Sequence, residues 1–218
     1  MNFEALPAQA ALRRIVSEGI DPVLTSVGFS ASRRRLTWVR SSDEVHHVIF
    51  VLRKRQFYDV QWGITVAGAS EVLWGVPSDI SDVGQAVMSG TPGSIRHPAP
   101  GQSWILESAI DQAALSKIVE AVRDDMQIVA DRLVDFKTRR DVRKYLLQNR
   151  EPIDDRDFVI PANLPLKLLT AATLALIDGD DEVCDLLPEV ETQMAPFRDK
   201  LSHDRVARLR RGADELCS

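Results

Sequence analysis

The hydrophobic period of this chain changes after Phe29, and that change constrains the fold more than any other feature. Before it, apolar residues such as Leu12 and Val16 recur at helical spacing. After it, Leu36 and Trp38 alternate with Arg35, Thr37 and Val39, which is the spacing of a half-buried strand. A change of period from about 3.6 residues to about 2 predicts a helical start followed by half-buried strands.

The helical start is expected to consist of two short helices. Gly19 interrupts the apolar pattern of the first helix. Asp21 suits the N-cap of the second helix, and Pro22 suits its first position. Gly28 suits the point where the second helix ends.

Three strands with short connections should form an antiparallel meander over residues 36–39, 45–55 and 57–66. In the third strand, apolar and polar residues alternate regularly, which gives one apolar and one polar face. The apolar face holds Tyr58, Val60, Trp62, Ile64 and Val66, and the polar face Asp59, Gln61, Gly63 and Thr65. The apolar face has to be covered, most simply by helices.

Glycine and proline concentrate in residues 68–101, which predicts loops. Short elements are expected around 71–74 and 83–88, because a structureless loop of this length is unusual in a compact domain. A fourth strand is expected at residues 103–107. Asp111 then suits the N-cap of a long amphipathic helix that could cover the sheet.

The predicted fold class is therefore α+β, with an antiparallel sheet of about four strands and helices on one face. Residues 1–150 form this domain in the prediction, residues 151–162 a proline-bounded acidic linker, and residues 163–218 a C-terminal helical module. Asn163 suits the N-cap of the first helix in that module.

Charge is patterned along the chain, although the total of 27 basic and 32 acidic residues gives a net charge of only −5. Residues 29–58 are mainly basic, residues 178–191 are acidic, and residues 198–211 are basic again. The net charge argues against general affinity for nucleic acid, but a local basic surface remains compatible with it. The acidic and basic helices of the C-terminal module are expected to pair with each other.

The two cysteines, Cys184 and Cys217, are expected to be separate thiols in a reducing cytoplasm, since disulfide-stapled secreted scaffolds usually have more cysteines. The N-terminal residues lack the basic start of a secretory signal, and no apolar run is long enough to span a membrane. The predicted location is cytoplasmic. The four histidines do not have zinc-ligand spacing, so no metal and no cofactor are predicted.

Several segments together resemble an uncharacterised bacterial family, domain of unknown function 4304, over about residues 10–150. The matching segments are Leu24-Thr-Ser-Val-Gly-Phe29, Arg35-Leu-Thr-Trp-Val-Arg40, Arg53-Lys-Arg-Gln56 and Trp62-Gly-Ile-Thr-Val66, followed by Arg96, Trp104-Ile-Leu, Asp111 and Tyr145-Leu-Leu. The family usually has a glutamine-rich end to its central strand, whereas Arg-Lys-Arg precedes Gln56 here. The resemblance implies a fold and no chemistry, since the family has no established activity.

Known catalytic motifs are missing from the sequence: it holds no phosphate-binding glycine loop, no GxSxG elbow and no HExxH. His46 and His47 are adjacent on a strand, so they point to opposite faces and cannot share one metal ion. The acidic clusters at 154–157 and 178–182 lack calcium-loop spacing, and the second is better explained as the cap of a helix.

Four arginines at strand ends are the candidate binding residues: Arg33, Arg35, Arg53 and Arg55. If their strand faces coincide, four guanidinium groups converge on the uncovered side of the sheet. Guanidinium groups bind carboxylates and phosphates. The alternative is a solvated polar face whose charges pair among themselves.

The leading hypothesis is a non-enzymatic, accessory or immunity-like protein that binds an acidic surface of another protein, through these arginines or through the C-terminal helices. A first alternative is an RNA- or DNA-binding module, although the aromatic residues Trp38, Tyr58 and Trp62 fall on covered faces and are not expected to stack on bases. A second alternative is an enzyme with a site near Arg96 and His97 in the glycine- and proline-rich loop.

Overall fold

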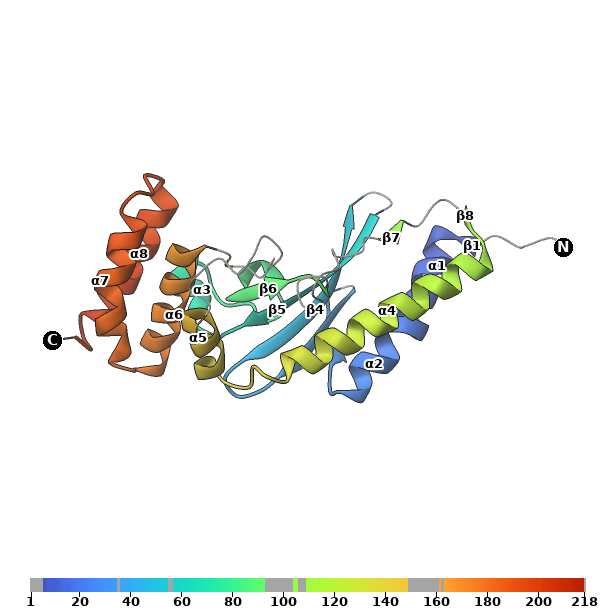
Figure 1. Cartoon of the computed structure of the whole chain (residues 1–218), viewed down its shortest axis with the longest axis horizontal. Helices are drawn as coiled ribbons and strands as arrows, with labels where there is room; N and C mark the ends of the chain where they lie inside the picture. Colours follow the sequence, from blue (N-terminus) through green and yellow to red (C-terminus); the bar gives the residue numbers. More distant parts are fainter. Residues whose placement is uncertain are drawn as a thin grey trace.

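A computed structural model gives the structure of the protein and describes residues 6–34, 36–54, 57–92, 104–105, 109–148, 161 and 163–217. The predicted α+β class is confirmed. An antiparallel sheet lies between two groups of helices, and the two termini lie at opposite ends of the molecule (Figure 1).

The N-terminal half contains these helices and strands in chain order: β1 (Leu6–Pro7), α1 (Ala8–Arg14), the π-helical η1 (Ile15–Ile20), α2 (Asp21–Ser26), β2 (Ser30–Ala31), β3 (Thr37–Ser41), β4 (His46–Lys54), β5 (Phe57–Thr65) and α3 (Ala69–Leu73). The C-terminal half continues with the 3-10 turn η2 (Val83–Gln85), β6 (Met88–Gly90), β7 (Trp104–Ile105), β8 (Ala109–Ile110), α4 (Gln112–Leu133), α5 (Arg139–Gln148), α6 (Leu164–Asp178), α7 (Glu182–Met194) and α8 (Lys200–Ala213).

The first helical segment runs without a break from α1 through η1 to α2, so the predicted interruption at Gly19 is wrong. Gly19 is needed for packing: a Cβ there would lie 3.2 Å from the backbone oxygen of Val119 in α4. Asp21 is not an N-cap either, since its carboxylate accepts a hydrogen bond of 2.8 Å from the indole of Trp38. Gly28 ends the segment with a φ of 87°, as predicted.

The sheet has the strand order β2-β3-β4-β5-β6, with β7 pairing with β5 outside that path. The meander β3-β4-β5 is confirmed, and all its pairs are antiparallel. Its register aligns Trp38, Ile49 and Trp62 across three strands. The sequence did not indicate β2 and β6, because each is only two or three residues long.

Helices cover the apolar face of the sheet, as predicted. Trp38, Ile49 and Trp62 on that face are at most 4% exposed. The bond from Trp38 to Asp21 places α2 on this face, and a hydrogen bond from His47 to the backbone oxygen of Phe136 places the residues that follow α4 there. Burial of these large side chains is the main stabilising contribution in the sheet domain.

The opposite face of the sheet is covered in part, whereas the prediction left it open. A Cβ on Gly63 would lie 2.8 Å from Val83 and 2.9 Å from Ala86, so the η2 segment lies directly over β5. Thr65, on the same face, donates a hydrogen bond of 2.8 Å to the backbone oxygen of Ile80.

Side-chain caps begin the later helices where the sequence placed them. Asp111 accepts from the backbone N–H of Ala114 at 2.8 Å at the start of α4, and Asn163 accepts from Leu166 at 3.0 Å at the start of α6. Thr138 and Asp141 bond reciprocally before α5, which forms a capping box.

The C-terminal helices pack directly on the sheet domain. α6 contacts α5 and α3, and α8 contacts α3 (Figure 1). Arg208 donates to the backbone oxygen of Val72 at 2.7 Å, and Arg205 donates to that of Leu73 at 2.8 Å. These carbonyls end α3, where helical backbone oxygens lack partners and the helix dipole favours a positive charge.

A second set of polar contacts joins α5 to the connection between α6 and α7. Arg139 pairs with Asp178, and the buried Arg143 pairs with Asp180 at 2.5 Å and with Glu182 at 3.1 Å. Asp178, Asp180 and Glu182 in the acidic stretch are therefore used by α5. The predicted pairing of the acidic helix with the basic last helix is seen at Glu191 and Arg210.

Cys184 and Cys217 form a disulfide, with their Cα atoms 5.5 Å apart, so the prediction of two separate thiols is wrong. The bond ties the start of α7 to the residues that follow α8. Sequence spacing did not show it, because the pairing depends on how two helices pack. The cytoplasmic location was inferred partly from free thiols and loses that support.

Among the described helices, none combines the length and the apolar composition that a membrane span requires.

Replacing Cys217 by Ser is expected to lower the free energy of unfolding by about 3 kcal/mol, because the bond closes a long loop in the unfolded chain. The linked residues are 33 positions apart. Equilibrium urea unfolding of the wild type and of C217S, both without reductant, measures the difference. Dithiothreitol should lower the urea midpoint of the wild type to that of C217S and leave the midpoint of C217S unchanged. Equal urea midpoints of the two proteins without reductant would contradict a stabilising role of the disulfide.

Candidate functional site

The structure places Arg33 outside the sheet. It is exposed and lies in the bend between β2 and β3. Leu36 has a φ of 56°, a left-handed conformation that does not continue a strand, so β3 begins only at Thr37. The prediction that Arg33 lies on the face of a strand is therefore wrong.

Arg53 lies in β4, where its backbone pairs with Tyr58. The side chain of Arg53, together with Arg35 and Arg55, lies outside the described residues. The convergence of the four arginines on one surface stays a prediction.

The neighbouring Arg34 shows how charge at this bend is balanced. Its guanidinium pairs with Asp79 at 2.5 Å and with Asp82 at 3.3 Å. The hydroxyl of Ser81, with Arg34 as a weaker contributor, holds the pKa of Asp79 below its usual range. This part of the basic segment is therefore neutralised within the protein, which reduces its value as a docking site for an acidic partner.

The aromatic residues of the sheet lie in the core, as predicted. Trp38, Tyr58 and Trp62 are 4%, 3% and 1% exposed. The indole of Trp62 donates to the backbone oxygen of Thr91 at 3.0 Å. Bases could stack on these rings only if the core opened, so these residues do not form a nucleic-acid platform.

His47 belongs to a buried network and has a structural role. Arg40 donates from Nε to Nδ1 of His47 at 3.1 Å, and Nε2 of His47 lies 2.7 Å from the backbone oxygen of Phe136. A guanidinium only donates and a carbonyl only accepts, so His47 is neutral with its proton on Nε2. Burial lowers the pKa of His47 to about 4. His46 pairs with Ser41 and so lies on the other face of the sheet.

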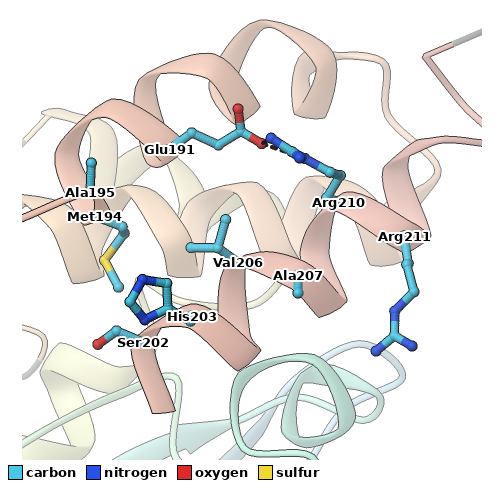
Figure 2. A pocket seen from close by; sticks show the side chains of 9 residues that line it. All are labelled: Glu191, Met194, Ala195, Ser202, His203, Val206, Ala207, Arg210 and Arg211. Carbon is cyan, nitrogen blue, oxygen red and sulfur yellow. Dashed lines mark hydrogen bonds and ion pairs between the residues drawn. The ribbon is translucent and has the colours of Figure 1, made fainter. Parts of the chain in front are cut away.

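A groove of about 650 Å³ lies between α7 and α8 (Figure 2). Met194 and Ala195, at the end of α7, and Val206 and Ala207, in α8, form its apolar floor. Met194 is 3% exposed, whereas Ala207 is exposed, so the floor extends from the core to the surface. We define these four residues as the α7–α8 floor.

Basic groups predominate on the rim of this groove. Arg210 donates from Nε to Glu191 at 2.7 Å, and Figure 2 shows this pair joining the two helices. Glu191 is thereby neutralised. Arg211 also lines the groove and makes no ion pair or hydrogen bond with any residue that the structure describes; its side chain is turned away from the Glu191–Arg210 pair (Figure 2).

Two large apolar side chains near the connection between α7 and α8 are exposed, but neither lines the groove. Phe197, in the connection between α7 and α8, is 37% exposed, and Leu201 at the start of α8 is 47% exposed.

Metal binding finds no support in the part of the chain that the structure describes, where no three His, Cys, Asp or Glu side chains form a suitable group. The acidic cluster at 178–182 is a cap, as predicted, because Asp180 accepts from the backbone N–H of Glu182 at 3.0 Å. The cluster at 154–157 lies outside the described residues, as do Arg96 and His97.

The comparisons with known proteins return no matching family model, no matching curated protein and no matching solved structure. The resemblance to domain of unknown function 4304 stays a prediction. The functional argument therefore depends on the geometry of the α7–α8 groove.

The network around His47 predicts a specific pH dependence of stability. The pKa of His47 is about 4 in the folded protein and 6.5 in the unfolded chain, so unfolding takes up a proton between these values. Its contribution to stability is present above pH 6.5 and is lost as the pH falls toward 4. Between pH 7.5 and pH 5, the wild type should lose about 2 kcal/mol through this group.

Urea unfolding of the wild type and of His47→Gln at both pH values measures this effect. H47Q should be less stable at pH 7.5, because the flexible amide does not reproduce the fixed geometry in which the imidazole bonds Arg40 and Phe136 together, but its stability should change less with pH. Equal pH dependence in the two proteins would show that His47 does not hold a depressed pKa.

Proposed function

We propose that this protein is a non-enzymatic binding protein that recognises another protein through the α7–α8 groove. The observation that carries the proposal is an apolar floor between α7 and α8 that stays open to solvent. Apolar patches rimmed by polar groups on a soluble surface commonly mark protein interfaces.

The shape of the groove supports a helical partner. On α8 it extends from Ser202 to Arg211, which corresponds to about 14 Å along the helix axis. An amphipathic helix of two to three turns would lay its apolar face on the floor, as helices do in other grooves.

The charges of the rim support an acidic partner. Glu191 is used by Arg210, so Arg211 is the charged group still available to a ligand within the described groove. A carboxylate on the partner helix would pair with Arg211. This agrees with the acidic partner predicted from the sequence and favours the second of the two predicted surfaces, the C-terminal helices.

The proposal does not include a compartment. The cytoplasmic location predicted from the sequence is weakened by the Cys184–Cys217 bond, since disulfides persist mainly in oxidising surroundings.

Site-specific crosslinking tests the proposal. A photoreactive amino acid at Ala207 in the full chain should crosslink one protein in the source cells, and the purified partner should then bind the wild type in solution. Ala207→Glu should weaken that binding about tenfold or more, because it adds a buried carboxylate to an apolar contact and repels the partner's acidic group.

Ala113→Glu is the matched control, since Ala113 is also an exposed alanine on a helix but lies on α4. It should leave the affinity unchanged. A partner that binds A207E as tightly as the wild type, or a crosslink to RNA in place of protein, would overturn the proposal.

A further inference from the structure

A second cavity lies where the C-terminal helices meet the sheet domain. It has a volume of about 320 Å³ and is bounded by α3, the η2–β6 segment, α6 and α8. Figure 1 shows α3 and α6 side by side between the sheet and the last two helices. We refer to this cavity as the junction cleft.

The lining of the junction cleft is mainly apolar and contains one cation. Leu73, Val87 and Leu169 are buried side chains of the core that line it. Ser89 and Thr170 contribute hydroxyl groups, and Arg205 contributes a guanidinium. An apolar cavity of this size with a few polar groups is typical of small-molecule sites.

Arg205 is only partly used by the protein. Its Nε donates to the backbone oxygen of Leu73 at 2.8 Å, which fixes the guanidinium at the cleft. Its two Nη groups make no hydrogen bond and no ion pair with any residue in the described ranges. The acid with the strongest electrostatic influence on it is Asp199, whose carboxylate already accepts from the backbone and hydroxyl of Ser202.

Arg205 is partly exposed, so its free Nη donors are open to a ligand that enters the cleft. A carboxylate fits those donors in a two-point hydrogen bond. The surrounding apolar lining requires that the rest of the ligand also be apolar. We propose that the junction cleft binds a small organic acid with an aliphatic or aromatic body, whose carboxylate is held by Arg205.

This site is separate from the α7–α8 groove and does not rest on the proposed function. Arg205 and the groove residue Ala207 both belong to α8, but Arg205 contacts α3 whereas Ala207 lines the cavity against α7. A ligand could occupy the cleft whether or not a protein binds the groove.

Calorimetric titration of the full-length protein with decanoate tests the proposal, with decanol as the neutral ligand of equal chain length. Decanoate should bind at one site per chain, and decanol should bind at least tenfold more weakly. Arg205→Gln should weaken decanoate binding about tenfold or more and leave decanol binding unchanged, because it removes a charge-assisted hydrogen bond.

Arg208→Gln is the matched control. Arg208 donates to the same backbone oxygen of Leu73, at 3.3 Å, but does not line the cleft. R208Q should bind decanoate like the wild type. Circular dichroism spectra should show that R205Q and R208Q are both folded, so that a loss of affinity in R205Q is not a loss of structure.

Ser89→Trp provides a second readout, since the indole would fill the cleft while Arg205 stays in place. It should abolish decanoate binding. Three results would each overturn the proposal. The wild type could fail to bind decanoate, it could bind decanol as tightly as decanoate, or R205Q and R208Q could lose the same amount of decanoate affinity.

Discussion

The contact between α8 and the end of α3 is the interaction on which the arrangement of this molecule depends. α3 is only five residues long, and its last carbonyls have no partners within the helix. Arg205 and Arg208 donate hydrogen bonds to these carbonyls, and their positive charges also interact favourably with the negative end of the helix dipole. Gly75 makes the approach possible: it turns the chain with a φ of 69°, and a Cβ there would lie 3.1 Å from Arg208.

Two consequences follow from this contact. The C-terminal helices share a continuous hydrophobic core with the sheet, so α6 lies against α3 and α5 and does not form a separate body. The last helix then presents different residues on its two sides. One side closes the junction cleft with Arg205, and the other leaves Val206 and Ala207 open beside α7.

The sequence predicted the elements whose signals are local. The meander followed from the alternation around Trp62, and the starts of the later helices followed from Asp111 and Asn163, whose side chains bond only a few residues away. The candidate site could not be predicted in the same way. Arg205 bonds to a backbone oxygen 132 positions away, and a carbonyl group is present in every residue, so no sequence signal marks it.

The incorrect predictions have the same origin. Gly19 looks like a helix breaker until the packing against α4 is known, and Arg33 looks like a strand residue until the left-handed turn at Leu36 is known. The ion pairs of the cap were also missed, because the sequence does not show that Arg143 in α5 lies against Asp180. In each case the local sequence allows several conformations of similar free energy, and tertiary packing selects one of them.

The most direct test is whether the sheet and the C-terminal helices unfold together. Trp74 lines the junction cleft, so the test uses a Trp74→Phe variant. Its remaining tryptophans, Trp38, Trp62 and Trp104, lie in strands of the sheet and report on the sheet domain, while far-ultraviolet circular dichroism also reports on the C-terminal helices. A single packed body predicts coincident urea transitions by the two methods. A separate dichroism transition with no change in fluorescence would show that the last helices are an independent unit, contrary to the structure described above.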